Sequence, residues 1–199
     1  YTLQNYLADQ INVGKIKPEG PEFDAAENAV RQRIERLLSN CQLPTANSQL
    51  PTPNCQLPTV DSFHKRLGKI LWEYCGMTRN TESLTKAKQL VKELEDEFWK
   101  NVFIPGSANE MNPELEKACR LEDYFELAQL VIDDAMHREE SCGGHFRTEH
   151  QTEDGETLRD DEHFMYVAAW AYQGHGQPET MEKEPLAYEH IQIANRNYK

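Results

Sequence analysis

Apolar residues return at helical spacing along most of the first 140 positions. From 23 to 39 one such stripe runs opposite a row of charged residues, as in an amphipathic helix. Similar stripes run through three later stretches, and a shorter one lies at the start. The spacing therefore predicts a helical lead-in and four longer helices, over residues 1–11, 23–39, 61–76, 81–102 and 112–137.

Local signals indicate where these helices begin and which faces they bury. Thr81 is a candidate N-cap, and Asn112 followed by Pro113 is a cap with proline in the first helical turn. We expect Trp72 and Cys75 to extend the buried face of the helix over 61–76. The expected core-facing residues of the helix over 23–39 are Phe23, Ala26, Val30, Ile34, Leu37 and Leu38.

The pattern changes after Phe146. Residues 164–172 are rich in aromatic and β-branched side chains, glycine and proline interrupt the chain at 174–178, and 186–193 form a second short apolar run. This predicts a two-stranded hairpin laid on the helices. The predicted fold is mainly α: an antiparallel helical bundle of three to four long helices with a small C-terminal β hairpin or extended ribbon.

Residues 40–60 hold three copies of a heptapeptide with proline at its fifth position. Such a unit forms neither a helix pair nor a strand ladder, so we expect an inserted, exposed loop, with a recognition epitope as the functional alternative. The chain then divides into a lead-in from a preceding domain (1–22), a helical bundle with the repeat insertion (23–140), and a docking loop with a C-terminal extended segment (141–199).

Composition narrows the possible partners. The 199 residues are 38% hydrophobic with a formal charge of −13, and this acidity opposes binding to nucleic acid or anionic lipid. Five cysteines without a C-x-x-C pair encode neither a disulfide framework nor a zinc ribbon. The longest nearly apolar patch, 127–132, is too short for direct membrane insertion. A start at Tyr1 without a leader predicts a piece of a longer protein.

The central loop, residues 138–147, gathers polar side chains around a Gly-Gly pair. Metal binding by His137, Cys142, His145 and His150 is one alternative, but their spacing matches no zinc pattern, and the arginines of the loop would stand beside the ion. Cys142 and His145 could also act as nucleophile and base. The sequence offers no orienting group or oxyanion donor for that pair.

Carboxylates flank the central loop at two places, and acid–base work by Glu139 with Glu140, or by Asp160 with Asp161, is one interpretation. We expect instead that the loop folds back and that arginines neutralise some of them. The neutralising candidates are Arg138, Arg147 and Arg159.

Polar groups crowded on a loop are more often placed for a partner than for internal packing. We therefore assign no catalytic, cofactor-binding or metal-binding residue and predict an interface. Alanine at His145 or Arg147 should then cost on the order of 1 kcal/mol each, as at partly exposed positions. The interface candidates are Arg138, Glu139, Ser141, Cys142, Gly144, His145, Arg147, Arg159, Asp160 and Asp161.

Two ordered motifs resemble the C-terminal region of succinate dehydrogenase and fumarate reductase flavoprotein subunits. Their usual loop is Arg-Glu-Ser-Arg-Gly-Ala-His, followed by Arg-Asp-Asp-x-x-aromatic. Here Arg138-Glu-Glu-Ser-Cys-Gly-Gly-His145 is followed by Arg159-Asp-Asp-Glu-His-Phe164 at a corresponding distance. Cys142 in place of the loop arginine and Gly144 in place of the alanine resemble the menaquinone-linked branch.

The resemblance implies a whole protein that interconverts succinate and fumarate with FAD, in electron transport and the tricarboxylic acid cycle. It implies preceding flavin and capping domains, an iron-sulfur subunit, and through that subunit a membrane anchor, so that the complex lies in the cytoplasm on the inner face of the cell membrane. No G-x-G-x-x-G or Walker loop is present, so this chain should not bind FAD itself. The competing interpretation is a freestanding acidic helical interaction module without catalysis.

Overall fold

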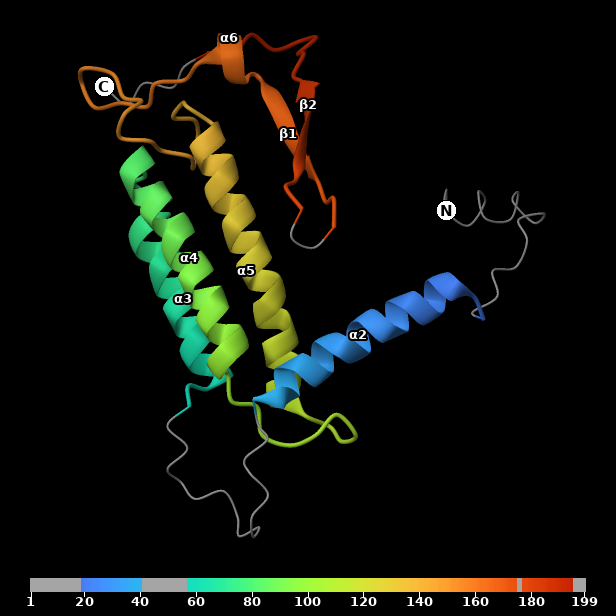
Figure 1. The fold of residues 1–199 in the computed structure, drawn as a ribbon. Helices are drawn as coiled ribbons and strands as arrows, with labels where there is room; N and C mark the ends of the chain where they lie inside the picture. The colour runs from blue at the N-terminus through green and yellow to red at the C-terminus, as the bar shows by residue number, and fades with distance from the viewer. Residues whose placement is uncertain (1–18, 41–56, 175–176, 195–199) are drawn as a thin grey trace, which may run out of the picture.

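The computed structural model describes residues 19–40, 57–174 and 177–194. Figure 1 shows helices grouped as a bundle with a hairpin beside them, so the predicted mainly-α fold with a small hairpin is confirmed. The predicted helix over 1–11 and the repeat residues 41–56 lie outside the described residues. The elements are α2 (Pro21–Ser39), α3 (Val60–Tyr74), α4 (Thr81–Asn101), α5 (Pro113–His137), α6 (Asp161–Phe164), β1 (Tyr166–Ala171) and β2 (Thr180–Pro185).

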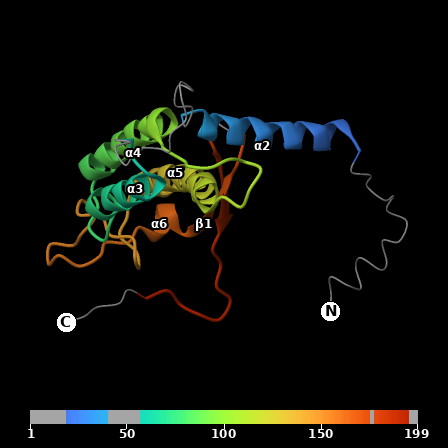
Figure 2. The ribbon, with the colours of Figure 1, turned by 90° about the horizontal axis from the view of Figure 1, so that it is seen from below.

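Three helices, α3, α4 and α5, lie side by side and hold the core, as the view along the bundle in Figure 2 shows. Each contributes one fully buried phenylalanine ring. The Phe98 ring centroid lies 5.4 Å from that of Phe63 and 5.5 Å from that of Phe125. Full burial of such a side chain contributes about 1.5–3 kcal/mol. No helix in the described part of the chain is long and apolar enough to cross a membrane.

The bundle helices begin at side-chain caps. Thr59 caps α3, and Asn112 caps α5 as predicted, with Pro113 in the first turn. The predicted cap at Thr81 is wrong: the Asn80 carbonyl oxygen Oδ1 accepts from the Ser83 backbone N–H at 2.7 Å, which makes Thr81 the first helical residue. The cap position falls to the residue whose short amide reaches the first turn.

Helix α2 forms as predicted but buries much less of its apolar face than expected. Only Leu37 is buried, and every residue from 21 to 30 is exposed. Figures 1 and 2 show why: the C-terminal end of α2 touches the base of the bundle, and the rest extends away from it. The expectation that Phe23 and Val30 face the core of this chain is therefore wrong.

Cys75 is buried as predicted, but Trp72 is 82% exposed. Residue 72 lies nine positions after Phe63, and at 100° per residue it points about 180° away from that core ring. The expectation that Trp72 extends the buried face is therefore wrong, because only the apolar character of the residue supported it.

The hairpin pairs β1 with β2 in antiparallel register, from Tyr166 opposite Pro185 to Ala171 opposite Thr180. The second strand, β2, therefore lies before the apolar run over 186–193, where the sequence had predicted it. A two-stranded ribbon that faces solvent tolerates the charged residues of β2. Trp170 fastens the hairpin to α5, since its indole N–H donates to Asp134 Oδ1 at 2.8 Å.

Candidate functional site

The central loop begins where α5 ends and turns back on itself within a few residues. The Cys142 backbone N–H donates to the His145 carbonyl at 2.8 Å, and the His145 N–H donates to the Cys142 carbonyl at 3.0 Å. Gly143 sits between them at a φ of +59°, a conformation that side chains resist. The Gly-Gly pair therefore forms a tight turn whose tip has open space around both α-carbons.

Arg147 points into the protein, with only 2% of its surface exposed. Its Nη1 donates to the carbonyls of Ala135 and Met136 at 3.1 Å each, at the C-terminal end of α5. Its Nη2 donates to the Thr81 hydroxyl at 2.7 Å, and its Nε donates to Glu149 Oε2 at 3.3 Å. One guanidinium thus joins the end of α5, the start of α4 and the chain beyond the loop. At the C-terminal end of α5 its positive charge also complements the helix dipole.

Ser141 completes this buried anchor. Its hydroxyl accepts from the Arg147 backbone N–H at 2.8 Å and donates to the Arg147 carbonyl at 3.1 Å. Ser141 is fully buried. Both side chains were predicted to serve an interface, and in the described chain both are buried and hydrogen-bonded internally. Their charge and hydrogen-bonding capacity are used inside the domain.

Arg138 and Glu140 connect the loop to the hairpin. Arg138 Nη1 lies 2.8 Å from Glu140 Oε1, which confirms the predicted neutralisation of this carboxylate. The same guanidinium donates to the carbonyls of Phe164 and Tyr166 at 3.0 and 3.2 Å, and lies 5.0 Å from the Tyr166 ring centroid. Glu140 Oε2 accepts from the Asp160 backbone N–H at 2.9 Å. Arg138 and Glu140 thus connect segments that lie 20 to 28 positions apart in the sequence.

The other two arginines that were expected to neutralise carboxylates of the loop have different partners. Arg159 pairs with Asp161, as predicted. Arg147 pairs with Glu149, a carboxylate that the sequence interpretation did not consider.

His145 uses both ring nitrogens within the domain. Nδ1 accepts from Arg79 Nη1 at 3.0 Å, so Nε2 carries the proton and donates to the Arg138 carbonyl at 2.8 Å. Burial lowers the pKa of His145, and the nearby positive charge of Arg79 lowers it further. The ring is therefore held neutral and is not aimed at Cys142 as a base. Arg79 was missed because no local signal marks a partner 66 positions away.

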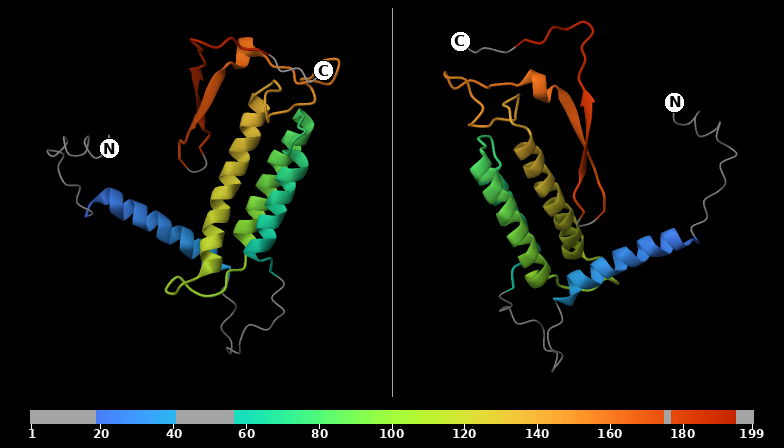
Figure 3. Two further views of the ribbon diagram at one scale, coloured as in Figure 1. Left: turned by 180° about the vertical axis from the view of Figure 1, so that it is seen from behind. Right: turned by 45° about the horizontal axis from the view of Figure 1, so that its top comes forward.

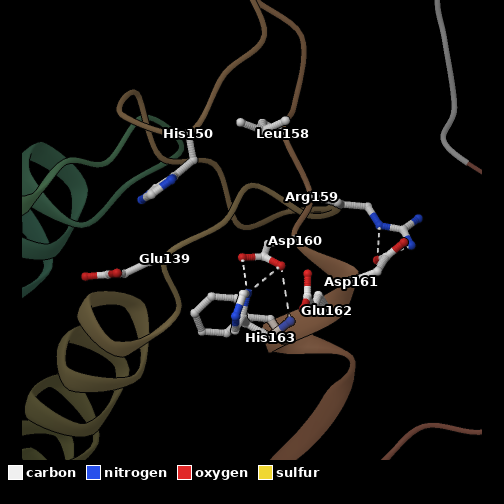
Figure 4. A pocket seen from close by; sticks show the side chains of 9 residues that line it. Glu139, His150, Leu158, Arg159, Asp160, Asp161, Glu162 and His163 are labelled. Atoms are coloured by element: carbon white, nitrogen blue, oxygen red, sulfur yellow. Dashed lines mark hydrogen bonds and ion pairs between the residues drawn. The ribbon is translucent and has the colours of Figure 1, made fainter.

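The acidic segment, residues 159–164, borders an open hollow of about 730 Å³, shown in Figure 4. Asp160 caps the short α6 by accepting from the His163 backbone N–H at 3.1 Å, and its carboxylate also lies 2.9 Å from His163 Nδ1. Glu139 and His150 line the opposite side of the hollow. Within the described residues, no group of three or more histidine, cysteine or acidic side chains is placed to hold a metal ion.

The candidate residues thus separate into an inner and an outer set. Ser141, Glu140 and Arg147 are buried, while Arg138 and His145 are half-buried. Glu139, Cys142, Gly144 and Asp161 are exposed, and Arg159 and Asp160 are half-buried beside the hollow. A partner that contacts the central loop from outside would therefore meet this outer set.

Known proteins resemble this chain both in sequence and in structure. The family model described as fumarate reductase flavoprotein C-term matches residues 64–198. The fumarate reductase flavoprotein subunit of Haemophilus influenzae is 26% identical over 132 residues, which cover 66% of this chain and 21% of that protein. The chloroplastic L-aspartate oxidase 2-a of Nicotiana tabacum is 40% identical over 82 residues, covering 41% of this chain and 12% of that protein.

A solved structure of the quinol fumarate reductase of E. coli superposes with a TM-score of 0.67 at 22% identity, which establishes the likeness of fold. The superposition covers 92% of this chain and 27% of the other. The chain therefore spans about a quarter or less of the length of the proteins that it resembles.

Proposed function

Since this chain belongs to the family of fumarate reductase flavoprotein C-terminal domains, we propose that it is the helical scaffold and contact domain of a longer flavoprotein that interconverts succinate and fumarate. The observation that carries the proposal is the family match over 64–198, which spans the whole central loop and the hairpin. The fold agrees with it, because the superposition on quinol fumarate reductase covers 92% of this chain with a TM-score of 0.67.

The described helices offer FAD no N-terminus suited to cradle a phosphate. Helix α2 opens with the acidic side chains of Glu22 and Asp24, which repel an anion, and the side chains of Thr59, Asn80 and Asn112 each accept one first-turn N–H group, of α3, α4 and α5 respectively. In the proposal, FAD is held by flavin and capping domains elsewhere in the longer protein. This domain supplies no catalytic residue.

The outer set of the central loop and the acidic segment is the proposed contact surface for the flavin domain and the iron-sulfur subunit. Cys142 and Gly144 are exposed on a turn that the buried Arg147 holds in place, and such preorganisation lowers the entropy cost of binding. Electrons would pass to the iron-sulfur subunit, and a membrane anchor would hold the complex at the inner face of the cell membrane.

Spectroscopy of the full-length protein tests this function. We expect a yellow protein that reduces a dye when succinate is added, while the 199-residue chain alone stays colourless with added FAD. The relatives named L-aspartate oxidase supply the second candidate, because their local identity is higher although their matched stretch is shorter. Oxidation of L-aspartate without any turnover of succinate or fumarate would replace the proposed substrate.

A freestanding acidic interaction module is the remaining alternative. It predicts a gene product without a flavin fingerprint and without bound flavin. A full-length protein with neither would contradict the proposal and support the module.

A further inference from the structure

Helix α2 carries an apolar stripe that the described chain leaves uncovered. Phe23, Ala26 and Val30 stand at positions i, i+3 and i+7, which share one side of a helix. Phe23 is 47% exposed and Val30 is 55% exposed. The same side continues into Ile34, which packs against the core, and Leu37, which belongs to it. The exposed stripe is thus the outer half of a packing surface whose inner half is already buried.

Among the described residues, the contacts that join α2 to the bundle come from its C-terminal half. Arg33 Nη2 donates to the Cys119 carbonyl at 2.8 Å and to Asp123 Oδ1 at 3.1 Å, and Arg36 lies 3.9 Å from the Trp99 ring centroid. All three views in Figures 1 and 3 show the remainder extending away from α5. Ten helical residues without tertiary support are marginal in water. The outer part of α2 therefore needs a surface to pack on.

A shaped space lies beside this stripe. A hollow of about 580 Å³ among α2, α4, α5 and the hairpin end has an apolar part formed by Ala29, Val30, Trp99 and Tyr172. The rest of its lining is polar or charged, from Gln32, Arg33, Arg36, Glu122, Asp123 and Glu126. Tyr172 is 67% exposed. A hollow that combines aromatic and aliphatic groups with charged ones matches the mixed composition of a contact between two protein surfaces.

We propose that the α2 stripe and this hollow receive the flavin-binding part of the same polypeptide. This inference rests on the proposed function, and the lengths of the relatives motivate it: the chain covers 27% of the quinol fumarate reductase chain that it resembles. A second copy of this chain is disfavoured, because two molecules with a formal charge of −13 each repel one another.

The size of the stripe also favours a covalently linked partner over a separate subunit. A stable interface between separate chains needs roughly 800 Å² from each partner. Two large apolar side chains and an alanine on a ten-residue helix supply much less. A linked domain is present at an effective concentration in the millimolar range, so a small apolar surface is enough to hold it.

Cysteine labelling of the full-length flavoprotein tests the proposal. Val30→Cys reports on the stripe, and Asn28→Cys is the matched control, because two residues turn the helix by about 200° to its opposite side. Native protein without the iron-sulfur subunit is treated with a maleimide at low protein concentration, and the labelled peptides are measured by mass spectrometry. We expect Val30→Cys to react at least tenfold more slowly than Asn28→Cys, and both to react alike in urea.

A second pair of variants keeps the test decisive if a cysteine variant folds poorly. Val30→Asp should expose α2 to limited proteolysis in the full-length protein, while Asn28→Asp leaves the cleavage rate unchanged. Equal labelling and equal proteolysis at the two positions would refute the docking surface. Protection that appears only with the iron-sulfur subunit, or only at high protein concentration, would refute it as well by assigning the stripe to another occupant.

The flavin absorbance of the same samples separates this inference from the function on which it rests. Unprotected Val30→Cys in a yellow, active protein refutes the docking surface and leaves the proposed function intact. A colourless protein refutes the proposed function, and the docking surface with it.

Discussion

Replacing Arg147 by methionine removes the buried anchor of the central loop while keeping most of the side-chain volume. The guanidinium donates to two carbonyls of α5, to Thr81 and to Glu149, and only 2% of the residue is exposed. Hydrogen bonds from a charged donor are worth about 1.5–3 kcal/mol each, but desolvating the cation offsets part of that sum. We expect a net loss of about 3 kcal/mol in the free energy of unfolding, above the order of 1 kcal/mol that the sequence alone suggested.

Urea denaturation of the 199-residue chain, followed by far-UV circular dichroism, measures this loss. Arg31→Met is the matched control, because Arg31 forms a single ion pair with Glu27 on the surface, and their side chains are 62% and 69% exposed. Such pairs contribute about 0.3–0.5 kcal/mol. Arg147→Lys should recover less than half of the loss, because one ammonium cannot reach acceptors arranged for a planar fork.

The reasoning is refuted if Arg147→Met and Arg31→Met differ by less than about 1 kcal/mol, or if Arg147→Lys is as stable as the parent chain. Either result would mean that the acceptors around Arg147 find water or other donors at little cost.

Four further substitutions test the same region by chemical denaturation. Ser141→Ala leaves the buried Arg147 N–H without its acceptor and should cost about 1–3 kcal/mol, so a neutral effect would contradict the anchor. Burial acts to raise the pKa of Glu149, but hydrogen bonds from Thr81 and Arg147 outweigh it and lower the pKa to about 2. The unfolded pKa is higher, so this carboxylate stabilises the fold above about pH 4.5. That stabilisation, about 1 kcal/mol after screening, is lost as the pH falls towards 2, and Glu149→Gln should abolish this pH dependence. Gly144→Ala should change the free energy of unfolding by less than about 0.5 kcal/mol, because its Cβ would meet open space. Gly143→Ala should cost about 1 kcal/mol, because residue 143 has a φ of +59°. A larger loss at residue 144 than at residue 143 would contradict the turn geometry.

Structural features that depend on residues close together in the sequence could be predicted. Contacts between residues far apart in the sequence could not. Helix periodicity and the cap at Asn112 are local, and α5 begins at Pro113 as its sequence indicates. The contact of Arg79 with His145 and that of Thr81 with Arg147 each join residues 66 positions apart. No spacing rule marks such pairs.

The hairpin shows a second limit of sequence reasoning. An apolar run predicts a strand only where one face of the sheet is buried, and β2 is almost wholly exposed, so its pairing depends on backbone hydrogen bonds to β1. The following apolar residues form no second strand. Leu186 instead anchors the chain through its backbone N–H, which donates to the Met165 carbonyl at 3.1 Å.

Substitutions at the inner and at the outer residues of the central loop should affect the binding of a partner in different ways. A buried guanidinium must satisfy its donors in fixed directions, so Arg147 sets the position of the loop relative to α4 and α5. Ser141 ties the two limbs of the loop together, and the paired backbone hydrogen bonds of Cys142 and His145 close the turn. The exposed tip is therefore held on a rigid base. A change at Arg147 would move the tip without removing any group that a partner touches, so it would weaken stability and assembly together. A change at exposed Cys142 would act mainly on assembly, because the turn at this residue is held by its backbone hydrogen bonds with His145.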